Sequence, residues 1–206
     1  MKLLKEEIGR KGDCVIYKID NFLSQQECDD IINLTRDKCE LQQSTIVYNN
    51  QLIVSNYRNS QSACVGESIL GREFYDSICD RASIVSGFPP SHVEPLKVVK
   101  YIEGQQYHLH HDYFTDSHPL FLENGGDRQA TLLIYLNEDF EGGETWFHHL
   151  DLKFKPTKGT AIYWQNLFYD EKGAKNYIIE TEHAGMMVFQ GEKWAVNLWL
   201  RERPYF

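Results

Sequence analysis

The chain lacks any long apolar segment. No run of residues approaches the roughly 20 that a helix needs to cross a bilayer. The first residues, MKLLKEE, contain too short an apolar stretch for a secretory signal. These absences exclude a membrane-spanning protein, predict that the chain has no membrane partner, and favour a cytoplasmic location.

Basic residues and cysteine motifs are also scarce. The 206 residues include 21 Lys and Arg against 30 Asp and Glu, giving a formal net charge of −9. This balance argues against a nucleic-acid partner, which would need clustered cations, although a local basic groove stays open. The five cysteines form no C-x-x-C pair, which argues against a zinc knuckle or a disulfide framework. No linker or repeat divides the chain, so one domain over residues 1–206 is expected.

Residues 1–92 are expected to provide helical support. Ser24 to Glu27 form a capping-box pattern, followed by a predicted helix of about fourteen residues. A second helix is predicted from about Ser68 to a stop at Gly87. From residue 93 onward, short apolar or alternating segments separated by turn residues predict a β-rich core. The expected class is mainly β with supporting helices (α+β).

The final predicted strand has two distinct faces. Trp194, Val196, Leu198 and Leu200 alternate on an apolar face, which indicates core. The opposite face carries Lys193, Ala195, Asn197 and Trp199, a mixture that suits a cavity lining better than solvent.

Residues 101–112 hold the strongest chemical signal, because His110 and Asp112 are two positions apart. Side chains at i and i+2 of a strand share a face, so an imidazole and a carboxylate are expected to converge. Alternation alone does not distinguish His110 from His108. A third ligand is expected from His183, since two His and one carboxylate form the facial site of non-haem Fe(II) oxygenases. Lys193 follows ten residues later and could hold a co-substrate carboxylate.

Several segments in order resemble the prolyl 4-hydroxylase family of Fe(II)/2-oxoglutarate dioxygenases. One is the pattern Y-x-x-G-Q-x-Y-x-x-H-x-D-Y-F at residues 101–114. The others are RQATLLIYLN (128–137), EGGET (141–145), PTKGTAIYW (156–164), HAG (183–185) with KW (193–194), and, upstream, NFLSQQEC (21–28) and RNS (58–60). The resemblance therefore covers nearly the whole chain.

This resemblance implies a double-stranded β-helix, a cupin-like jelly roll, with N-terminal helices. It implies an enzyme like procollagen-proline 4-dioxygenase, which hydroxylates peptidyl proline at C4 while 2-oxoglutarate is converted to succinate and CO₂. Fe(II), 2-oxoglutarate, O₂ and the reductant ascorbate are the implied cofactors, and a proline-containing peptide or protein is the implied partner. The absence of a signal distinguishes the chain from secreted animal relatives and favours a bacterial or viral origin.

The resemblance also assigns roles to single residues. It selects His110 over His108, so the implied metal ligands are His110, Asp112 and His183. Lys193 would bind the distal carboxylate of 2-oxoglutarate. The remaining implied contacts are Tyr101 and Thr131 to the same co-substrate, and Tyr107, Arg58, Arg128 and Trp199 to the substrate.

Three alternatives stay open at this point. The chain could be a 2-oxoglutarate oxygenase acting on free proline, lysine or another protein side chain. It could be a cupin-like binding module without turnover, although the complete set of four residues argues against this. A zinc hydrolase could use the same three ligands, but Lys193 would then have no explanation. Neither the target protein nor the oligomeric state follows from the sequence.

Overall fold

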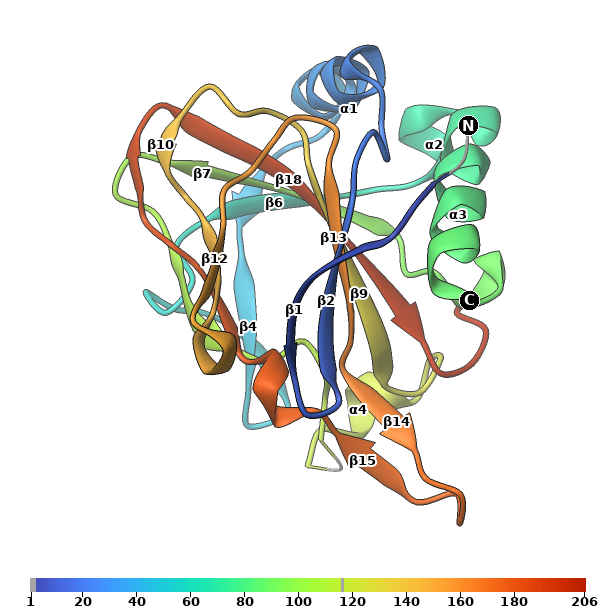
Figure 1. The fold of residues 1–206 in the computed structure, drawn as a ribbon. Coiled ribbons are helices and arrows are strands. Elements are labelled where there is room, and N and C mark those ends of the chain that lie inside the picture. Colours follow the sequence, from blue (N-terminus) through green and yellow to red (C-terminus); the bar gives the residue numbers. More distant parts are fainter. Residues whose placement is uncertain (1–2, 116) are drawn as a thin grey trace.

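The computed structural model describes residues 3–115 and 117–206. Its elements form three layers, in which helices cover one face of a large antiparallel sheet and a smaller sheet lies against the other face (Figure 1). The two faces of the large sheet therefore have different neighbours. This arrangement confirms the expected class, mainly β with supporting helices.

The large sheet has eight strands. In spatial order these are β1 (Glu6–Lys11), β2 (Cys14–Ile19), β13 (Ala161–Gln165), β9 (Arg128–Tyr135), β18 (Glu192–Arg201), β7 (Leu96–Ile102), β6 (Gln61–Val65) and β3 (Gln42–Gln43). The long strand β18 is central, pairing with β9 on one side and β7 on the other.

The small sheet has four strands, and three further two-stranded pairs lie outside the two main sheets. The small sheet runs β12 (Leu152–Phe154), β11 (Thr145–Phe147), β16 (His183–Gly185) and β8 (Tyr107–His110). The pairs are β4 (Thr45–Tyr48) with β5 (Gln51–Val54), β10 (Glu141–Gly142) with β17 (Val188–Gln190), and β14 (Leu167–Tyr169) with β15 (Lys175–Tyr177).

The first helix, α1 (Gln25–Lys38), confirms the prediction made from its capping box. The Glu27 amide donates to Ser24 Oγ at 3.2 Å, and the Ser24 amide donates to Glu27 Oε2 at 2.7 Å. Two of the amides that a helix leaves without partners at its start are thereby satisfied. Leu23 and Cys28, on either side of the cap, are both buried in the core beneath the helix.

The second predicted helix is interrupted. The chain forms α2 (Glu67–Leu70) and then α3 (Arg72–Ser86), separated by Gly71 at φ +85°. A left-handed residue cannot continue an α-helix, so the single helix predicted from Ser68 to Gly87 was wrong at this point. Its predicted end is confirmed, because Gly87 caps α3 at φ +82°. The remaining helix is the short α4 (Pro119–Leu122), and 3₁₀ turns span Pro90–His92, His148–Leu150 and Ile179–Thr181.

Alternation along β18 divides the interior into two cores. The predicted apolar face, Trp194, Val196, Leu198 and Leu200, packs beneath the helices. Ala195 points the other way, into a core between the two sheets that includes Tyr135, Phe147 and Trp164. The cavity described below opens on this second side of β18.

The description of residues 1–92 as helical support was incomplete. Strands β1, β2, β3 and β6 of the large sheet also come from this half of the chain. The division into one domain over residues 1–206 stays a prediction. All five cysteines are free thiols. Among the described residues, no helix is both long and apolar enough to span a bilayer.

Candidate metal centre and its cavity

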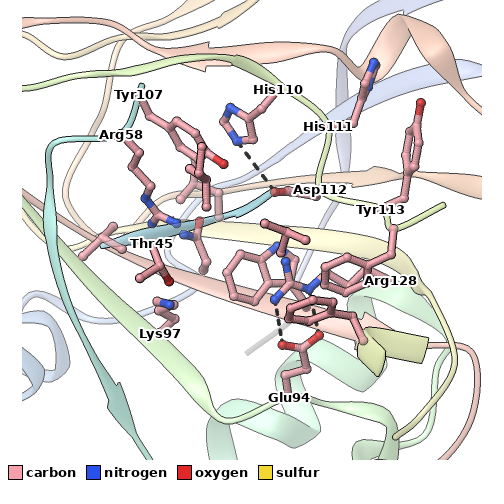
Figure 2. Close-up of a pocket in the computed structure, with 18 of the residues that line it drawn as sticks. Thr45, Arg58, Glu94, Lys97, Tyr107, His110, His111, Asp112, Tyr113 and Arg128 are labelled. Atoms are coloured by element: carbon pink, nitrogen blue, oxygen red, sulfur yellow. Dashed lines mark hydrogen bonds and ion pairs between the residues drawn. The ribbon is translucent and has the colours of Figure 1, made fainter. Parts of the chain in front are cut away.

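A cavity of about 570 Å³ opens between the two sheets. Its lining includes Lys193, Ala195, Asn197 and Trp199, the alternate face of β18 that the sequence predicted to be a cavity wall. Residues of β7 and β9 continue this wall, while β8 and β16 of the small sheet form the facing side. Figure 2 shows the side chains that project into the space.

Three potential metal ligands converge on the small-sheet side. His110 and His183 are direct partners in the antiparallel pairing of β8 with β16. Asp112 lies two residues beyond the end of β8, so the predicted strand does not extend to it. His110 Nε2 is nevertheless 3.8 Å from Asp112 Oδ1, and His183 Nε2 is 3.8 Å from Asp112 Oδ2. One ligand atom from each of the three lies within 4.8 Å of the other two.

Backbone carbonyls hold both imidazoles in place. His110 Nδ1 is 2.8 Å from the His108 carbonyl oxygen, and His183 Nδ1 is 2.8 Å from the Thr181 carbonyl oxygen. A carbonyl only accepts, so each Nδ1 donates its proton there, and each Nε2 is the ring atom that faces Asp112 and could bind a metal. Metal-binding histidines are oriented in this way by a second hydrogen bond. Two imidazole nitrogens and one carboxylate on one side of a point fit Fe(II) with open positions.

Burial sets the charges of this group. Burial is the main cause that holds the pKa of His110 well below its usual value, and the neighbouring His183 lowers it further. The His110 imidazole is therefore neutral near pH 7. Burial alone would raise the pKa of Asp112. The imidazoles of His183 and His110 oppose this effect, and the net pKa of the carboxyl is lowered. Asp112 therefore supplies the negative charge of this group, which suits a divalent cation.

Thr131 has a different neighbour from the one that the resemblance implied. Its buried hydroxyl donates to Asp112 Oδ2 at 2.7 Å and accepts from Asn166 Nδ2 at 3.0 Å. The single hydroxyl proton therefore goes to Asp112. A contact between Thr131 and 2-oxoglutarate stays a prediction, whereas its bond to Asp112 orients the carboxylate from the large sheet.

Lys193 lies inside the cavity, only 3% exposed. Its Nζ donates to the Gly143 carbonyl oxygen at 2.8 Å and lies 5.5 Å from the ring centres of Tyr101 and Tyr135. Burial lowers the pKa of Lys193 to about 8, with a smaller opposing effect from Glu144. Among the described residues, no carboxylate forms an ion pair with this ammonium. It therefore has a charge available for an anion.

Gly143 and Tyr101 define the space around Lys193. Gly143 has φ +67°, and a Cβ there would lie 2.8 Å from the Phe140 ring and 3.2 Å from the Lys193 side chain. Only glycine meets both demands without strain. Tyr101, on β7, is directly paired with Lys193 in the sheet and also lines the cavity. The predicted Lys193 and Tyr101 are thus brought together, on the sheet that faces the metal ligands.

Arg128 is held by an ion pair within the cavity wall. Its Nε and Nη2 donate to the two oxygens of Glu94 at 2.8 and 3.0 Å (Figure 2). Arg201 Nη1 also donates to Glu94 Oε1, at 2.8 Å. The Arg128 guanidinium also lies 3.4 Å above the Trp199 ring centre. Two predicted substrate residues, Arg128 and Trp199, therefore form one stacked unit that Glu94 holds in place.

Arg58 and Tyr107 form a second stacked unit. The Arg58 guanidinium lies 4.6 Å from the centre of the Tyr107 ring, which in turn stacks on His110 at 3.5 Å. Arg58 comes from the polar run between residues 55 and 62 and is only 4% exposed. Strand alternation alone also allowed His108 as a ligand. His108 is exposed, and its ring centre lies 5.0 Å from the ring centre of Tyr57. The structure therefore brings His110, not His108, to Asp112 and His183.

Glu94, Lys97 and Asn166 were not identified from the sequence. Lys97 precedes Tyr101 by four residues on β7, so strand alternation could have placed both on one face. Nothing local marks Glu94, whose partners lie 34 and 107 residues away. Asn166 reaches Thr131 across 35 residues and gives no sequence signal either.

Comparison with known proteins agrees with this geometry. Residues 96–201 match the 2OG-Fe(II) oxygenase superfamily. A protein of Acanthamoeba polyphaga mimivirus, named as a candidate prolyl 4-hydroxylase, is 33% identical over 196 residues, covering 92% of this chain and 75% of that protein. A crystal structure of the viral collagen prolyl hydroxylase of Paramecium Bursaria Chlorella virus-1, in complex with 2-oxoglutarate, is 32% identical. It superposes with a TM-score of 0.69 over 90% of this chain and 95% of that one.

A more distant structure shares the fold. The prolyl hydroxylase of Trichoplax adhaerens, in complex with a peptide fragment of the hypoxia inducible factor oxygen degradation domain, is 17% identical and superposes with a TM-score of 0.66 over 91% of this chain and 83% of that one. The expected double-stranded β-helix is confirmed by these likenesses. The chain belongs to the prolyl 4-hydroxylase family of the 2OG-Fe(II) oxygenase superfamily.

Proposed function

We propose that this enzyme hydroxylates proline at C4 within a peptide or protein, with His110, Asp112 and His183 as its Fe(II) ligands and Lys193 as the residue that binds 2-oxoglutarate. The convergence of the three ligands within 4.8 Å, in the cavity that contains Lys193, supports this function most directly. As a member of its family the enzyme uses Fe(II), 2-oxoglutarate and O₂, and ascorbate is typical of prolyl hydroxylases.

The bound metal, with 2-oxoglutarate and O₂, supplies the oxidising chemistry, in which one oxygen atom enters the substrate C–H bond and the other enters succinate as CO₂ leaves. The protein supplies placement and exclusion of water. His110 and His183 offer Nε2 lone pairs fixed by their Nδ1 hydrogen bonds, and Asp112 offers the anion. Lys193, buried and with a free charge, would bind the distal carboxylate of the co-substrate through a charge-assisted hydrogen bond.

The substrate side of the cavity is aromatic and suits a prolyl ring, which has apolar faces and no hydrogen-bond donor in a peptide. Tyr107 stacks beside His110, and Trp199 lies beneath the Arg128 guanidinium. We propose that four side chains contact the peptide: Tyr107, Trp199, Arg128 and Arg58. A peptide substrate agrees with the Trichoplax structure, which was solved with a peptide bound.

The experiment that tests this function supplies short proline-rich peptides with Fe(II), 2-oxoglutarate and O₂, and locates the added oxygen by mass spectrometry and NMR. We expect a hydroxyl group at proline C4, with one succinate formed for each hydroxylation. Free proline should react much more slowly, because it brings two charges into an aromatic site. Oxygen added to a residue other than proline, or faster turnover of free proline, would contradict the proposal.

A further inference from the structure

The cavity is basic although the protein is acidic. Five Lys and Arg side chains line it against two carboxylates, whereas the whole chain carries a net charge of −9. Both carboxylates already have partners. Glu94 bonds to Arg128 and Arg201, and Asp112 lies among the metal-facing histidines and accepts from Thr131. The proposed function gives Lys193 to 2-oxoglutarate, so two cations remain.

These two cations are Arg58 and Lys97. Arg58 Nε donates to Ser60 Oγ at 3.2 Å, but its buried Nη2 has no hydrogen-bond partner. Among residues 3–115 and 117–206, no carboxylate forms an ion pair with Arg58 or Lys97, and no acceptor is bonded to Lys97 Nζ. Arg58 is buried and Lys97 is half-buried. Charges withdrawn from water without an anionic partner are unfavourable, so a cavity that keeps two of them is suited to receive an anion.

The two side chains face one part of the cavity. Figure 2 shows Arg58 pointing toward Thr45 and Lys97, on the side away from the Glu94–Arg128 pair. All five of these residues line the same cavity. Burial is the main cause that lowers the pKa of Lys97, and the positive charge of Arg58 lowers it further. The two cations are therefore close enough to repel one another. A carboxylate between them would relieve both effects.

Stacking fixes the position of Arg58 relative to the metal centre. Arg58 lies 4.6 Å from the ring centre of Tyr107, and Tyr107 lies 3.5 Å from that of His110. The Arg58 end of the pair is thus one aromatic ring beyond the nearest metal-facing histidine. An extended peptide advances about 3.3–3.6 Å per residue. A carboxylate held here would belong to a residue at or next to the proline that is being hydroxylated.

We propose that Arg58 and Lys97 form a carboxylate-binding subsite that makes this enzyme select substrates with an acidic group close to the target proline. This inference rests on the proposed function for its substrate. The group is an Asp or Glu side chain in a peptide, or the α-carboxylate of a chain that ends at the proline. Both place the same anion between the two cations, and the peptides below separate them.

The test compares blocked peptides of equal length, with acetyl and amide ends, that carry Glu, Gln or Lys before or after one proline. A fourth peptide ends at the proline with a free carboxylate, and a fifth is its amide. Binding is measured calorimetrically without O₂, on enzyme loaded with Fe(II) and 2-oxoglutarate. Hydroxylation is measured separately with O₂. Binding therefore reports on the subsite whether or not the peptide is turned over.

We expect a Glu peptide to bind at least about tenfold more tightly than its Gln counterpart, which corresponds to about 1.4 kcal/mol, and a Lys peptide to bind more weakly than either. Lys97→Gln should bring the Glu to Gln ratio close to one, and Lys97→Glu should abolish or reverse it. Lys172→Gln is the matched control, because this lysine is exposed in the turn between β14 and β15. It removes the same charge and should leave the ratio unchanged. Thermal melts of each variant check folding.

The outcomes separate the two proposals. A preference confined to the free-carboxylate peptide would keep the subsite and assign the anion to a chain end. Equal affinity for all the peptides in the unmodified enzyme, together with oxygen at proline C4, would overturn the subsite and leave the proposed function standing. Selective binding of Glu peptides with no oxygen added to proline would overturn the proposed function and leave the subsite. A ratio that Lys97→Gln and Lys172→Gln lower equally would show a general charge effect and contradict the subsite.

Discussion

The two sheets that face each other across the cavity hold their functional side chains in different ways. On the small sheet, His110 and His183 each bond to a carbonyl two residues earlier in the chain. On the large sheet, Lys193 and Arg128 bond to partners 50 and 34 residues away. The orientation of the two imidazoles is therefore local, whereas the positions of Lys193 and Arg128 depend on tertiary packing. Changes on the small sheet should affect the metal, and changes on the large sheet should affect organic ligands and stability.

Asp112→Ala should have the largest effect, because it removes a proposed metal ligand on the side of the cavity that the small sheet forms. It removes the only anionic ligand of the proposed site, so Fe(II) affinity and turnover should both fall to background. Metal titration of the apoprotein and a succinate assay measure the two losses. Asp112→Asn, which keeps the size of the side chain, should fail in the same way. Near-native activity of either variant at limiting iron would contradict the ligand assignment.

Arg128→Ala should mainly destabilise the fold. Breaking a buried ion pair costs about 3–5 kcal/mol, and the lower end is expected because Arg201 still pairs with Glu94. Denaturant unfolding measures this loss. The control is Arg72→Ala, since Arg72 pairs with Glu67 at the surface and should contribute about 1 kcal/mol or less. At temperatures where the variant is folded, peptide hydroxylation should fall far more than uncoupled 2-oxoglutarate decarboxylation.

Lys193→Ala should distinguish most clearly between the roles of the two sheets. A charge-assisted hydrogen bond in a buried site contributes roughly 1.5–3 kcal/mol, which weakens 2-oxoglutarate binding by about ten- to a hundredfold. Fe(II) binding should be unchanged, because the ammonium bonds to Gly143 and not to a metal ligand. Calorimetric titration of each ligand provides the comparison. An unchanged half-saturation for 2-oxoglutarate would place the required cation elsewhere.

Thr131→Val is a large-sheet change that should act on the metal. It keeps the shape of the side chain and removes the hydroxyl that donates to Asp112 Oδ2. Loss of such a supporting bond typically lowers metal affinity about ten- to a hundredfold. Metal affinity is measured without 2-oxoglutarate, so that a co-substrate contact cannot contribute. Weaker 2-oxoglutarate binding with unchanged metal affinity would instead support the role that the family resemblance implied for Thr131.

The pH dependence of co-substrate binding should show the smallest effect. Burial lowers the pKa of Lys193 to about 8, and only the ammonium form binds a carboxylate strongly. Affinity for 2-oxoglutarate should therefore be steady below pH 8 and fall by up to about tenfold per pH unit above it. In Lys193→Arg the guanidinium stays charged, so this fall should disappear. A flat profile in the unmodified enzyme would show that the ammonium is not the binding group.

The features that the sequence predicted correctly are those with a local cause. Alternation identified both faces of β18, and the capping box identified the start of α1. Alternation also placed His110 near Asp112, although β8 ends before the carboxylate. The choice between His110 and His108 required the family pattern, because period-two spacing treats them alike.

The features that were missed depend on distant partners. The pairing of β2 with β13 joins the beginning of the chain to residues 161–163, and no local pattern marks it. Glu94 becomes a site residue only because Arg128 and Arg201 fold around it. The break at Gly71 was hidden because apolar residues continue at helical spacing on both sides of it. Lys97 was missed although its alternation with Tyr101 was readable.

The direct pairing of His110 with His183 makes the metal a reporter of correct assembly. Strand β16 follows β8 by more than seventy residues, so the two imidazoles meet only after most of the chain has been placed. A slip of one residue would turn one imidazole to the opposite face of the small sheet. Under the proposed ligand assignment, such a misfolded chain could acquire at most two of its three ligands. The fraction of refolded protein that retains iron against a weak chelator would then count the molecules whose strands have closed in the native register.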